Sequence, residues 1–376
     1  MNKMVQFLFA TIEKALSILL PVWLWRKSFH FAMRRLGRQG MNYVTVHWRP
    51  KNSERVKAWS DPLGPENGLA IVMQGPLVQA NDFTLESFRI YRRIFPGCQL
   101  ILSTWVDQDP THIARIQDVG VDVVLNELPD NAGFKNINLQ IASSSSGTQA
   151  AKRHGARFVL KTRTDQRMYS PNLAPLLINL LEVFPVAQGF RQKKRIIAAS
   201  LGSHKYMMYQ ISDMFLFGGV DDMATYWNAA FTNETRPDDL QDTIGEVKRF
   251  QPPEQYLCTS FLRQVGREIV WDLEYSWQSI ADHFCIVDRH ILDLVWFKYA
   301  KYSEYSYLRY DAIAASQELT FLEWLNLYSE DRYADRAVPY RTVQSLSFHD
   351  PVSQAAQKAH PGTSAKTEYT CAVVKL

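Results

Sequence analysis

The sequence lacks the short motifs of several large enzyme classes. It contains no G-x-x-x-x-G-K-[ST] phosphate loop, no G-x-G-x-x-G fingerprint, no H-E-x-x-H zinc motif and no G-x-S-x-G nucleophile elbow. These absences argue against P-loop kinases, dehydrogenases of the glycine-fingerprint type, zincins and serine hydrolases. Cysteine is also scarce, because the four thiols are far apart and form no C-x-x-C pair. Isolated thiols indicate a reducing compartment rather than a disulfide framework or a zinc site.

A strong excess of positive charge is also missing. The chain has 42 Lys and Arg residues against 38 Asp and Glu residues, which gives a net charge of +4. This near-balance is unlike a dedicated nucleic-acid binder, so no nucleic-acid partner is expected. The 376 residues, 46% of them hydrophobic, are enough to bury a large core. One catalytic domain of roughly 250 residues with appendages fits this length.

A long uninterrupted apolar run is absent as well. The N-terminal stretch Met4–Trp25 is apolar, but Glu13 and Lys14 divide it, and its longest uncharged part, Ala15–Trp25, has eleven residues. A spanning helix needs about twenty. Because basic residues follow, we predict that residues 1–40 contain an apolar helix that lies on a membrane surface. A marginal membrane span and a helix packed on the protein's own body are the alternatives.

What the sequence does contain is a rhythm of strands and helices after a polar connector, residues 41–68. Short apolar runs predict strands over residues 69–73, 99–105, 121–125 and 157–161, and helical patterns lie between them. Strands that alternate with helices predict an α/β fold with a mostly parallel, Rossmann-like sheet and flanking helices.

The second half of the chain continues this domain less regularly. Apolar runs predict further strands at residues 195–199, 211–217 and 268–271. We therefore expect a catalytic domain over residues 69–300, with a nucleotide-binding half (69–168) and an acceptor half (169–300). A helical extension (301–350) and a flexible tail (351–376) follow it.

Polar residues gather where the predicted fourth strand ends, at Lys161–Arg167. Ligands of such sheets bind beyond the carboxyl ends of the strands. Asp165 would supply a hard oxygen ligand to Mg²⁺ or Mn²⁺, while Lys161, Arg163 and Arg167 would neutralise the phosphates of a diphosphate. An ion-paired surface turn is the alternative interpretation.

Other polar positions suit a donor site less specifically. Gln74, Gly75 and Pro76 follow the first strand, where glycine permits close approach of the backbone to a nucleotide. Thr104 ends the second strand, and Asn138 and Gln140 lie on the helix before the fourth strand. An ordinary turn is the alternative for Gln74–Pro76, and polar residues that cap and solvate a helix are the alternative for Asn138 and Gln140.

Two carboxylates are candidates for a general base. Glu254 begins a helix after two prolines, where it either complements the helix dipole or takes a proton from an acceptor hydroxyl. Asp213 lies in an apolar run, and a buried carboxylate requires a partner or a function. His283, Asp288 and His349 are weaker candidates for a metal shell.

Six segments resemble the WavE family of lipopolysaccharide-synthesis proteins: "IVMQGPL", "FPGCQLILSTW", "NINLQIASSSSG", "VLKTRTDQRM", "ISDMFLFGG" and "PPEQYL". They occur in order, and the match covers roughly residues 69–298. The resemblance implies a GT-A-like glycosyltransferase that moves a sugar from a nucleotide-sugar donor to a lipid-linked saccharide. It also implies bacterial surface-polysaccharide synthesis at the cytoplasmic face of the inner membrane.

The sequence departs from the metal-dependent GT-A pattern at one position. Such enzymes carry Asp-x-Asp at the fourth strand end, whereas this chain has Arg163-Thr164-Asp165, with only the second carboxylate. The helix that begins at Glu254 resembles the element that bears the acidic base, which favours Glu254 over Asp213. A nucleotidyltransferase-like enzyme and a non-catalytic component of polysaccharide assembly are the alternative functions.

Overall fold

The structure is a computed structural model that describes residues 21–40, 48–57, 68–234, 251–297 and 318–330. The chain divides into two compact units, Met1–Arg49 and Pro50–Leu376. The predicted tail, residues 351–376, lies outside the described residues.

The first unit contains helix α2, Val22–Gly40. The predicted apolar stretch Met4–Trp25 lies mostly outside the described residues. The ring of Phe29 on α2 packs edge-on against Trp48, with 5.4 Å between ring centroids. Among the helices that the structure describes, none is long and apolar enough to cross a membrane.

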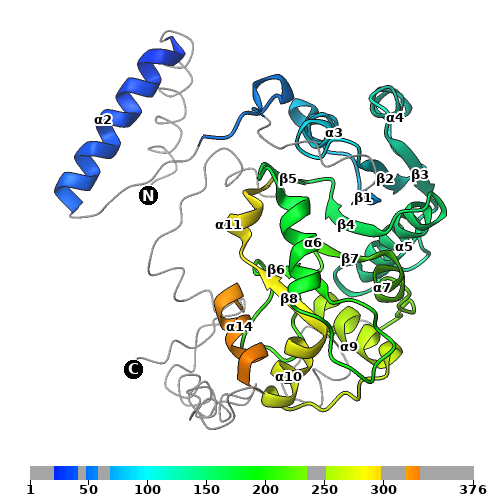
Figure 1. The fold of residues 1–376 in the computed structure, drawn as a ribbon. Coiled ribbons are helices and arrows are strands. Elements are labelled where there is room, and N and C mark those ends of the chain that lie inside the picture. The colour runs from blue at the N-terminus through cyan, green and yellow to red at the C-terminus, as the bar shows by residue number, and fades with distance from the viewer. Residues whose placement is uncertain (1–20, 41–47, 58–67, 235–250, 298–317, 331–376) are drawn as a thin grey trace, which may run out of the picture. The chain divides into compact units, whose positions relative to one another are not determined.

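The second unit is built on a seven-stranded sheet in the order β3-β2-β1-β4-β7-β6-β8, flanked by helices (Figure 1). Neighbouring strands are parallel except that β7 runs antiparallel to both β4 and β6. The strands are β1 (Leu69–Gln74), β2 (Gln99–Trp105), β3 (Asp122–Asn126), β4 (Phe158–Arg163), β6 (Ile196–Ala199), β7 (Leu216–Gly219) and β8 (Phe284–Val287). The predicted α/β, mostly parallel sheet is confirmed.

The centre of this sheet forms because β1 up to Met73 and the first three residues of β4 are apolar. All six residues of β1 are buried, as expected for a parallel strand covered on both faces. Strand β1 pairs with β2 on one side and with β4 on the other, and the register places Gln74 beside Arg163. The polar residues at the ends of these strands therefore lie along one edge of the sheet.

The helices follow the strands. They are α3 (Phe83–Ile94), α4 (Pro110–Gln117), α5 (Ile137–Arg153), α6 (Leu173–Val183), α7 (Val220–Tyr226), α9 (Pro253–Val265), α10 (Leu273–His283), α11 (Arg289–Leu292) and α14 (Phe321–Glu330). Short 3₁₀ turns are η1 (Ser53–Arg55), η3 (Ala80–Asp82) and η4 (Phe134–Asn136). Helix α14 is the described part of the predicted extension.

A small second sheet lies beside the end of β4. Strand β5 (Gln166–Met168) pairs antiparallel with β9 (Leu294–Trp296), so residues far apart in the chain meet there. The backbone N–H of Phe297 also donates to the Asp165 carbonyl, at 2.8 Å. This pairing fixes the segment that carries Asp165.

Two of the predicted strands differ in the structure. Strand β7 begins only at Leu216, and residues 268–271 form no strand. Their side chains Ile269 and Trp271 instead pack on the core from an irregular segment. This segment ends at Asp272, whose side chain caps α10 by accepting a hydrogen bond from the Tyr275 N–H. An apolar run forms a strand only where a neighbouring strand can pair with it. The strand that pairs with β6 is β8, not residues 268–271.

The described cysteines, Cys98, Cys258 and Cys285, are buried and form no disulfide.

Candidate active site

The polar residues at the ends of β1, β2 and β4 interlock. The Gly75 N–H donates to the Ser103 carbonyl at 3.1 Å, and the Thr104 hydroxyl donates to the Gly75 carbonyl at 2.9 Å. The Thr164 hydroxyl donates to the Pro76 carbonyl at 2.6 Å. Gly75 has a φ of +118°, and a Cβ there would lie 3.0 Å from Thr164 Oγ1, so glycine is required. The structure thus joins these predicted residues through Thr164, which the sequence did not single out.

The side chains of Gln74 and Gln140 differ in their hydrogen bonding. The side chain of Gln74 is buried, and its Oε1 accepts a hydrogen bond from the Ser143 hydroxyl at 2.9 Å, so it holds α5 against β1. Gln140 lies nearby on α5, and its buried Oε1 has no hydrogen-bond partner among the described residues. Since a buried polar atom without a partner is unfavourable, Gln140 stays a candidate for contact with a ligand.

Asn138 serves as a clamp between two loops. Its amide nitrogen donates to the carbonyls of Asn131 and Thr232, at 2.9 and 2.8 Å. Its Oδ1 accepts from the Thr232 N–H at 2.9 Å. These bonds occupy the side chain, so its arrangement suits a positioning role beside the predicted donor site.

Arg163 and Asp165 form a two-pronged ion pair just beyond β4. Arg163 Nε lies 2.8 Å from Asp165 Oδ1, and Arg163 Nη2 lies 3.0 Å from Oδ2. The indole N–H of Trp296 on β9 also donates to Oδ2, at 3.1 Å. Both oxygens of the predicted metal ligand are therefore engaged by protein donors.

Lys161 lies inside the protein, fully buried on β4. Its ammonium donates to the Asp213 carbonyl and lies 4.7 Å from the centre of the Trp227 ring. Burial lowers the pKa of Lys161 to about 8, while the nearby Asp213 carboxylate acts in the opposite direction. Lys161 is thus placed to stabilise the segment that carries Asp213 rather than to reach solvent.

Arg167 is a buried anchor on β5. Its guanidinium donates to the Ser87 hydroxyl, the Lys51 carbonyl and the Phe83 carbonyl, at 2.9, 2.8 and 2.8 Å. It also lies 4.2 Å from the centre of the Phe83 ring. These contacts tie α3 and the preceding segment to β5, so the structure gives Arg167 a packing environment rather than an open one.

Asp213 and Glu254, the two candidate bases, lie near one another. Asp213 is 3% exposed, and its Oδ2 is buried with no hydrogen-bond partner among the described residues. Glu254 is the second residue of α9, after Pro253, which suits the first turn of a helix. Burial raises the pKa of Glu254 above its ordinary value, and the Asp213 charge raises it further, although Lys135 acts in the opposite direction.

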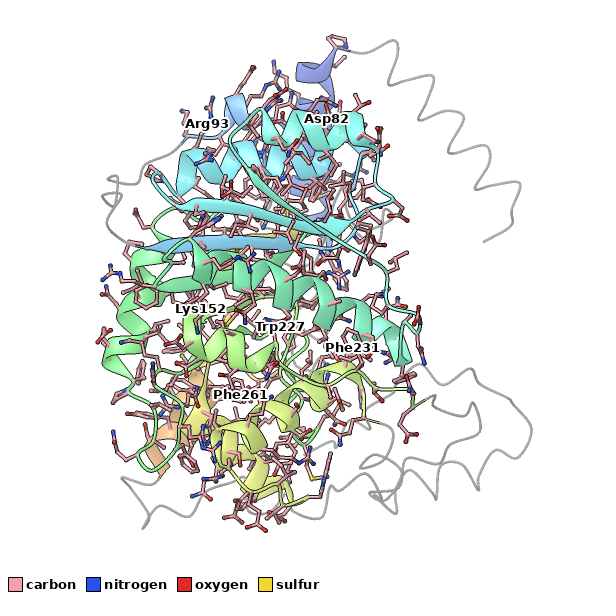
Figure 2. The ribbon with its side chains drawn as sticks, turned by 90° about the vertical axis from the view of Figure 1, so that its right-hand side faces the viewer. Asp82, Arg93, Lys152, Trp227, Phe231 and Phe261 are labelled. Atoms are coloured by element: carbon pink, nitrogen blue, oxygen red, sulfur yellow. The ribbon has the colours of Figure 1, made fainter. Side chains whose placement is uncertain are left out.

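A tyrosine hydroxyl lies near this carboxylate pair. The pKa of Tyr226 is raised, first by burial and then by the nearby Cys258, Asp213 and Glu254. The Tyr226 hydroxyl, the Trp227 indole N–H and both amide atoms of Gln255 are buried, and among the described residues they have no hydrogen-bond partner. Figure 2 labels Trp227, which follows α7 directly, and Phe261 on α9.

Tyr226, Trp227 and Gln255 are fully buried, and Tyr226 lies near both carboxylates. A buried donor or acceptor without a partner is unfavourable, so these atoms set the region apart from the rest of the core. Tyr226, Trp227 and Gln255 carried no recognisable signal in the sequence, because α7 and α9 come together only through the fold.

The residues present fit a divalent metal poorly. In the part of the chain that the structure describes, no three His, Cys, Asp or Glu side chains are grouped to hold a metal ion. Asp165 is paired with Arg163, and His283 Nδ1 pairs instead with Gln192 Oε1, at 2.6 Å. Asp288 accepts a hydrogen bond from the Phe321 N–H at 3.0 Å, and His349 lies outside the described residues.

Comparison with known proteins identifies one matching family model. The model described as WavE lipopolysaccharide synthesis matches residues 69–360. No curated protein matches the chain.

Two solved structures are similar in part. One is a glycosyltransferase involved in the glycosylation of the major capsid of PBCV-1, with 15% identity and a TM-score of 0.30, covering 63% of this chain and 97% of that one. Another is mannose-1-phosphate geranyltransferase from Thermus thermophilus, with 19% identity and a TM-score of 0.22, covering 35% of this chain and 40% of that one.

Proposed function

This chain belongs to the WavE lipopolysaccharide synthesis family, and we propose that it is a GT-A-like glycosyltransferase that takes a sugar from a nucleotide-sugar donor. The observation that carries the proposal is the proximity of buried Asp213 to half-buried Glu254 at the start of α9. The acceptor in this proposal is a lipid-linked saccharide of bacterial surface-polysaccharide synthesis.

Glu254 is the general base in the proposed reaction. The acceptor hydroxyl attacks the anomeric carbon of the donor sugar, the bond from that carbon to the diphosphate breaks, and Glu254 takes the hydroxyl proton. A base works best when its pKa lies near the working pH, and burial together with Asp213 moves the pKa of Glu254 in that direction. Such a base contributes roughly 10²- to 10⁴-fold to the rate.

The donor occupies the ends of β1, β2 and β4 in this proposal. Gln74, Gly75, Pro76 and Thr104 shape the nucleotide side, and Gln140 offers an unpartnered oxygen next to it. Asn138, Lys161 and Arg167 hold the loops and strands that form this edge, and Arg163 ends β4 there. No step of the proposed reaction passes through a metal ion.

The proposal is tested by a donor screen with the full chain. Purified protein is incubated with radiolabelled UDP-, GDP- and ADP-sugars and with truncated lipopolysaccharide or lipid-linked saccharide, and transfer to the lipid fraction is counted. We expect transfer from one donor class. Nucleotide binding without transfer to any acceptor would favour a nucleotidyltransferase-like enzyme, and no binding at all would favour a non-catalytic component.

We further propose that the first unit binds the cytoplasmic face of the bacterial inner membrane. Helix α2 carries Arg34, Arg35 and Arg38, and Phe31 and Trp48 in the same unit are 66% and 55% exposed. Exposed aromatic and basic side chains suit an anionic lipid surface. The full chain should therefore sediment with phosphatidylglycerol vesicles but not with phosphatidylcholine vesicles, and equal binding to both would contradict this proposal.

The basic residues of α2 also provide the matched variants for that test. Charge reversal of Arg34 and Arg35 to Glu should weaken vesicle binding about tenfold or more, because each basic side chain near an anionic surface contributes about 1 kcal/mol. Arg153→Glu, at the exposed end of α5, is the control and should bind as the wild type does.

A further inference from the structure

Metal-dependent enzymes of the proposed kind place carboxylates where β4 ends, and this chain has a guanidinium there. Arg163 occupies the position of the first carboxylate in the Asp-x-Asp pattern, and its side chain is 21% exposed. A guanidinium is positively charged at every physiological pH and suits the geometry of phosphate oxygens. The change therefore replaces a metal-attracting group with a group that itself carries positive charge.

The remaining carboxylate, that of Asp165, forms an ion pair with this guanidinium. Arg163 contacts Asp165 through two nitrogens, at 2.8 and 3.0 Å, and Trp296 holds the Oδ2 atom at 3.1 Å. A divalent cation would compete with the guanidinium for these oxygens and would be repelled by its charge. The cation that Asp165 binds in this fold is thus Arg163.

The surrounding structure holds the pair rigidly. Trp296 lies on β9, and β9 pairs with β5, the strand that begins directly after Asp165. The Phe297 N–H also donates to the Asp165 carbonyl, at 2.8 Å. The Arg163 guanidinium also lies 5.9 Å from the centre of the Trp296 ring. A charged group fixed in this way needs little reorganisation to stabilise a developing negative charge.

We infer that this protein binds the diphosphate of its donor without a divalent metal ion, through an Arg163 side chain that Asp165 and Trp296 orient. The inference rests on the proposed glycosyltransferase function. In it Arg163 contacts the leaving diphosphate, and Asp165 and Trp296 are positioning residues.

The first test needs no variant and no activity. Mn²⁺ is titrated into the full chain, and bound Mn²⁺ is followed by the loss of its free electron paramagnetic resonance signal. We expect no binding at Mn²⁺ concentrations up to about 1 mM. A Kd above this value corresponds to a binding free energy weaker than about 4 kcal/mol. Stoichiometric binding tighter than this would overturn the inference while leaving the proposed function in place.

The second test follows the nucleotide. The affinities for UDP and GDP are measured by calorimetry in EDTA and in Mn²⁺, and we expect values within about threefold of each other. Affinity that falls tenfold or more in EDTA would overturn the inference. Binding of neither nucleotide in either buffer would overturn the proposed function, and the inference with it.

The variant Arg163→Asp supplies the converse test. It restores the Asp-x-Asp pattern, so we expect it to gain Mn²⁺ binding and to become dependent on Mn²⁺ for nucleotide binding. Arg153→Asp adds a carboxylate at the exposed end of α5 and should gain neither property. Binding of Mn²⁺ by the wild type as tight as by Arg163→Asp would contradict the exclusion of the metal by Arg163.

Discussion

Buried Asp213 lies near half-buried Glu254, and the charge of Asp213 adds to burial in raising the pKa of Glu254. Two neighbouring carboxylates are costly to ionise together, so the protein maintains this arrangement at some expense in stability. The same feature gives Glu254 the properties of a base. Stability and function are thus opposed at this pair.

The pH dependence of transfer should depend on Asp213. Activity requires ionised Glu254, so kcat/KM falls as the pH decreases through the raised pKa of Glu254. In Asp213→Asn the neighbouring charge is removed, so the pKa of Glu254 falls and the acidic limb of the profile moves to lower pH. Asp118→Asn, at an exposed helix end, should leave the limb in place. An acidic limb that moves to higher pH in Asp213→Asn would refute the coupling.

Replacement of Glu254 by Gln should stabilise the protein at neutral and higher pH. The folded pKa is raised, so the folded state binds more protons than the unfolded chain, and wild-type stability falls as the pH rises above the ordinary value. The glutamine of the variant does not ionise, so its stability does not fall with pH in this way. The Tm of the variant should therefore exceed that of the wild type by an amount that grows as the pH rises from about 4. For a domain of this size, each 1 kcal/mol of added stability corresponds to a rise in Tm of about 2–4 °C. A constant difference across pH would argue against the raised pKa.

Removal of the Lys161 amine should destabilise the fold at about pH 9.5, above the lowered pKa of Lys161, where its charge no longer opposes burial. At that pH Lys161→Met leaves the buried Asp213 carbonyl without its donor, at a cost of about 1–3 kcal/mol in the free energy of unfolding. Lys152, whose ion pair with Asp221 is 49% and 44% exposed, supplies the control, and Lys152→Met should cost less than about 1 kcal/mol. Urea denaturation of both variants measures the difference.

The same variant has a distinct pH signature. Burial lowers the pKa of Lys161 to about 8, so between that value and the higher pKa of the unfolded chain the folded state binds fewer protons. Wild-type stability therefore rises with pH in this window, and Lys161→Met lacks that rise. The cost of the substitution should be larger at about pH 9.5 than at about pH 7.

The contact of α5 with the sheet depends on Gly147. A Cβ at this position would lie 2.5 Å from Val72 Cγ1 and 3.0 Å from Ser103 Cβ. Alanine gains about 1 kcal/mol of helix propensity, but overpacking of a stiff valine costs about 1–3 kcal/mol, so Gly147→Ala should be neutral to destabilising. Gln149→Ala, on the exposed side of the helix, should be neutral to stabilising. A thermal melt in which Gly147→Ala is the more stable of the two would contradict the close packing.

The sequence predicted those parts of the fold that depend on local pattern. The continuous apolar run of Leu69–Gln74 indicated a central parallel strand, and the prolines before Glu254 indicated a helix start. In contrast, residues 268–271 have a strand-like composition but no strand to pair with. Pairing is a property of the tertiary structure, which local composition does not contain.

The site was predictable to a similar extent. Strand ends marked Gly75, Thr104 and Asp165 because parallel topology alone brings them to one edge. The partner of Asp165 was not visible, because Trp296 lies 131 residues away and meets it only through the β5–β9 pair. Arg167 likewise looked like a phosphate ligand, and its burial against α3 became evident only in three dimensions.

The rate of sugar transfer by Glu254→Gln tests the central claim most directly. Glu268→Gln, an exposed position just after α9, is the matched control, and nucleotide affinity is measured for both variants. The account predicts that Glu254→Gln lowers kcat by roughly 10²-fold or more with nucleotide affinity unchanged, while Glu268→Gln retains wild-type rates. A Glu254→Gln variant that transfers sugar as fast as the control would contradict the assignment of Glu254 as the base.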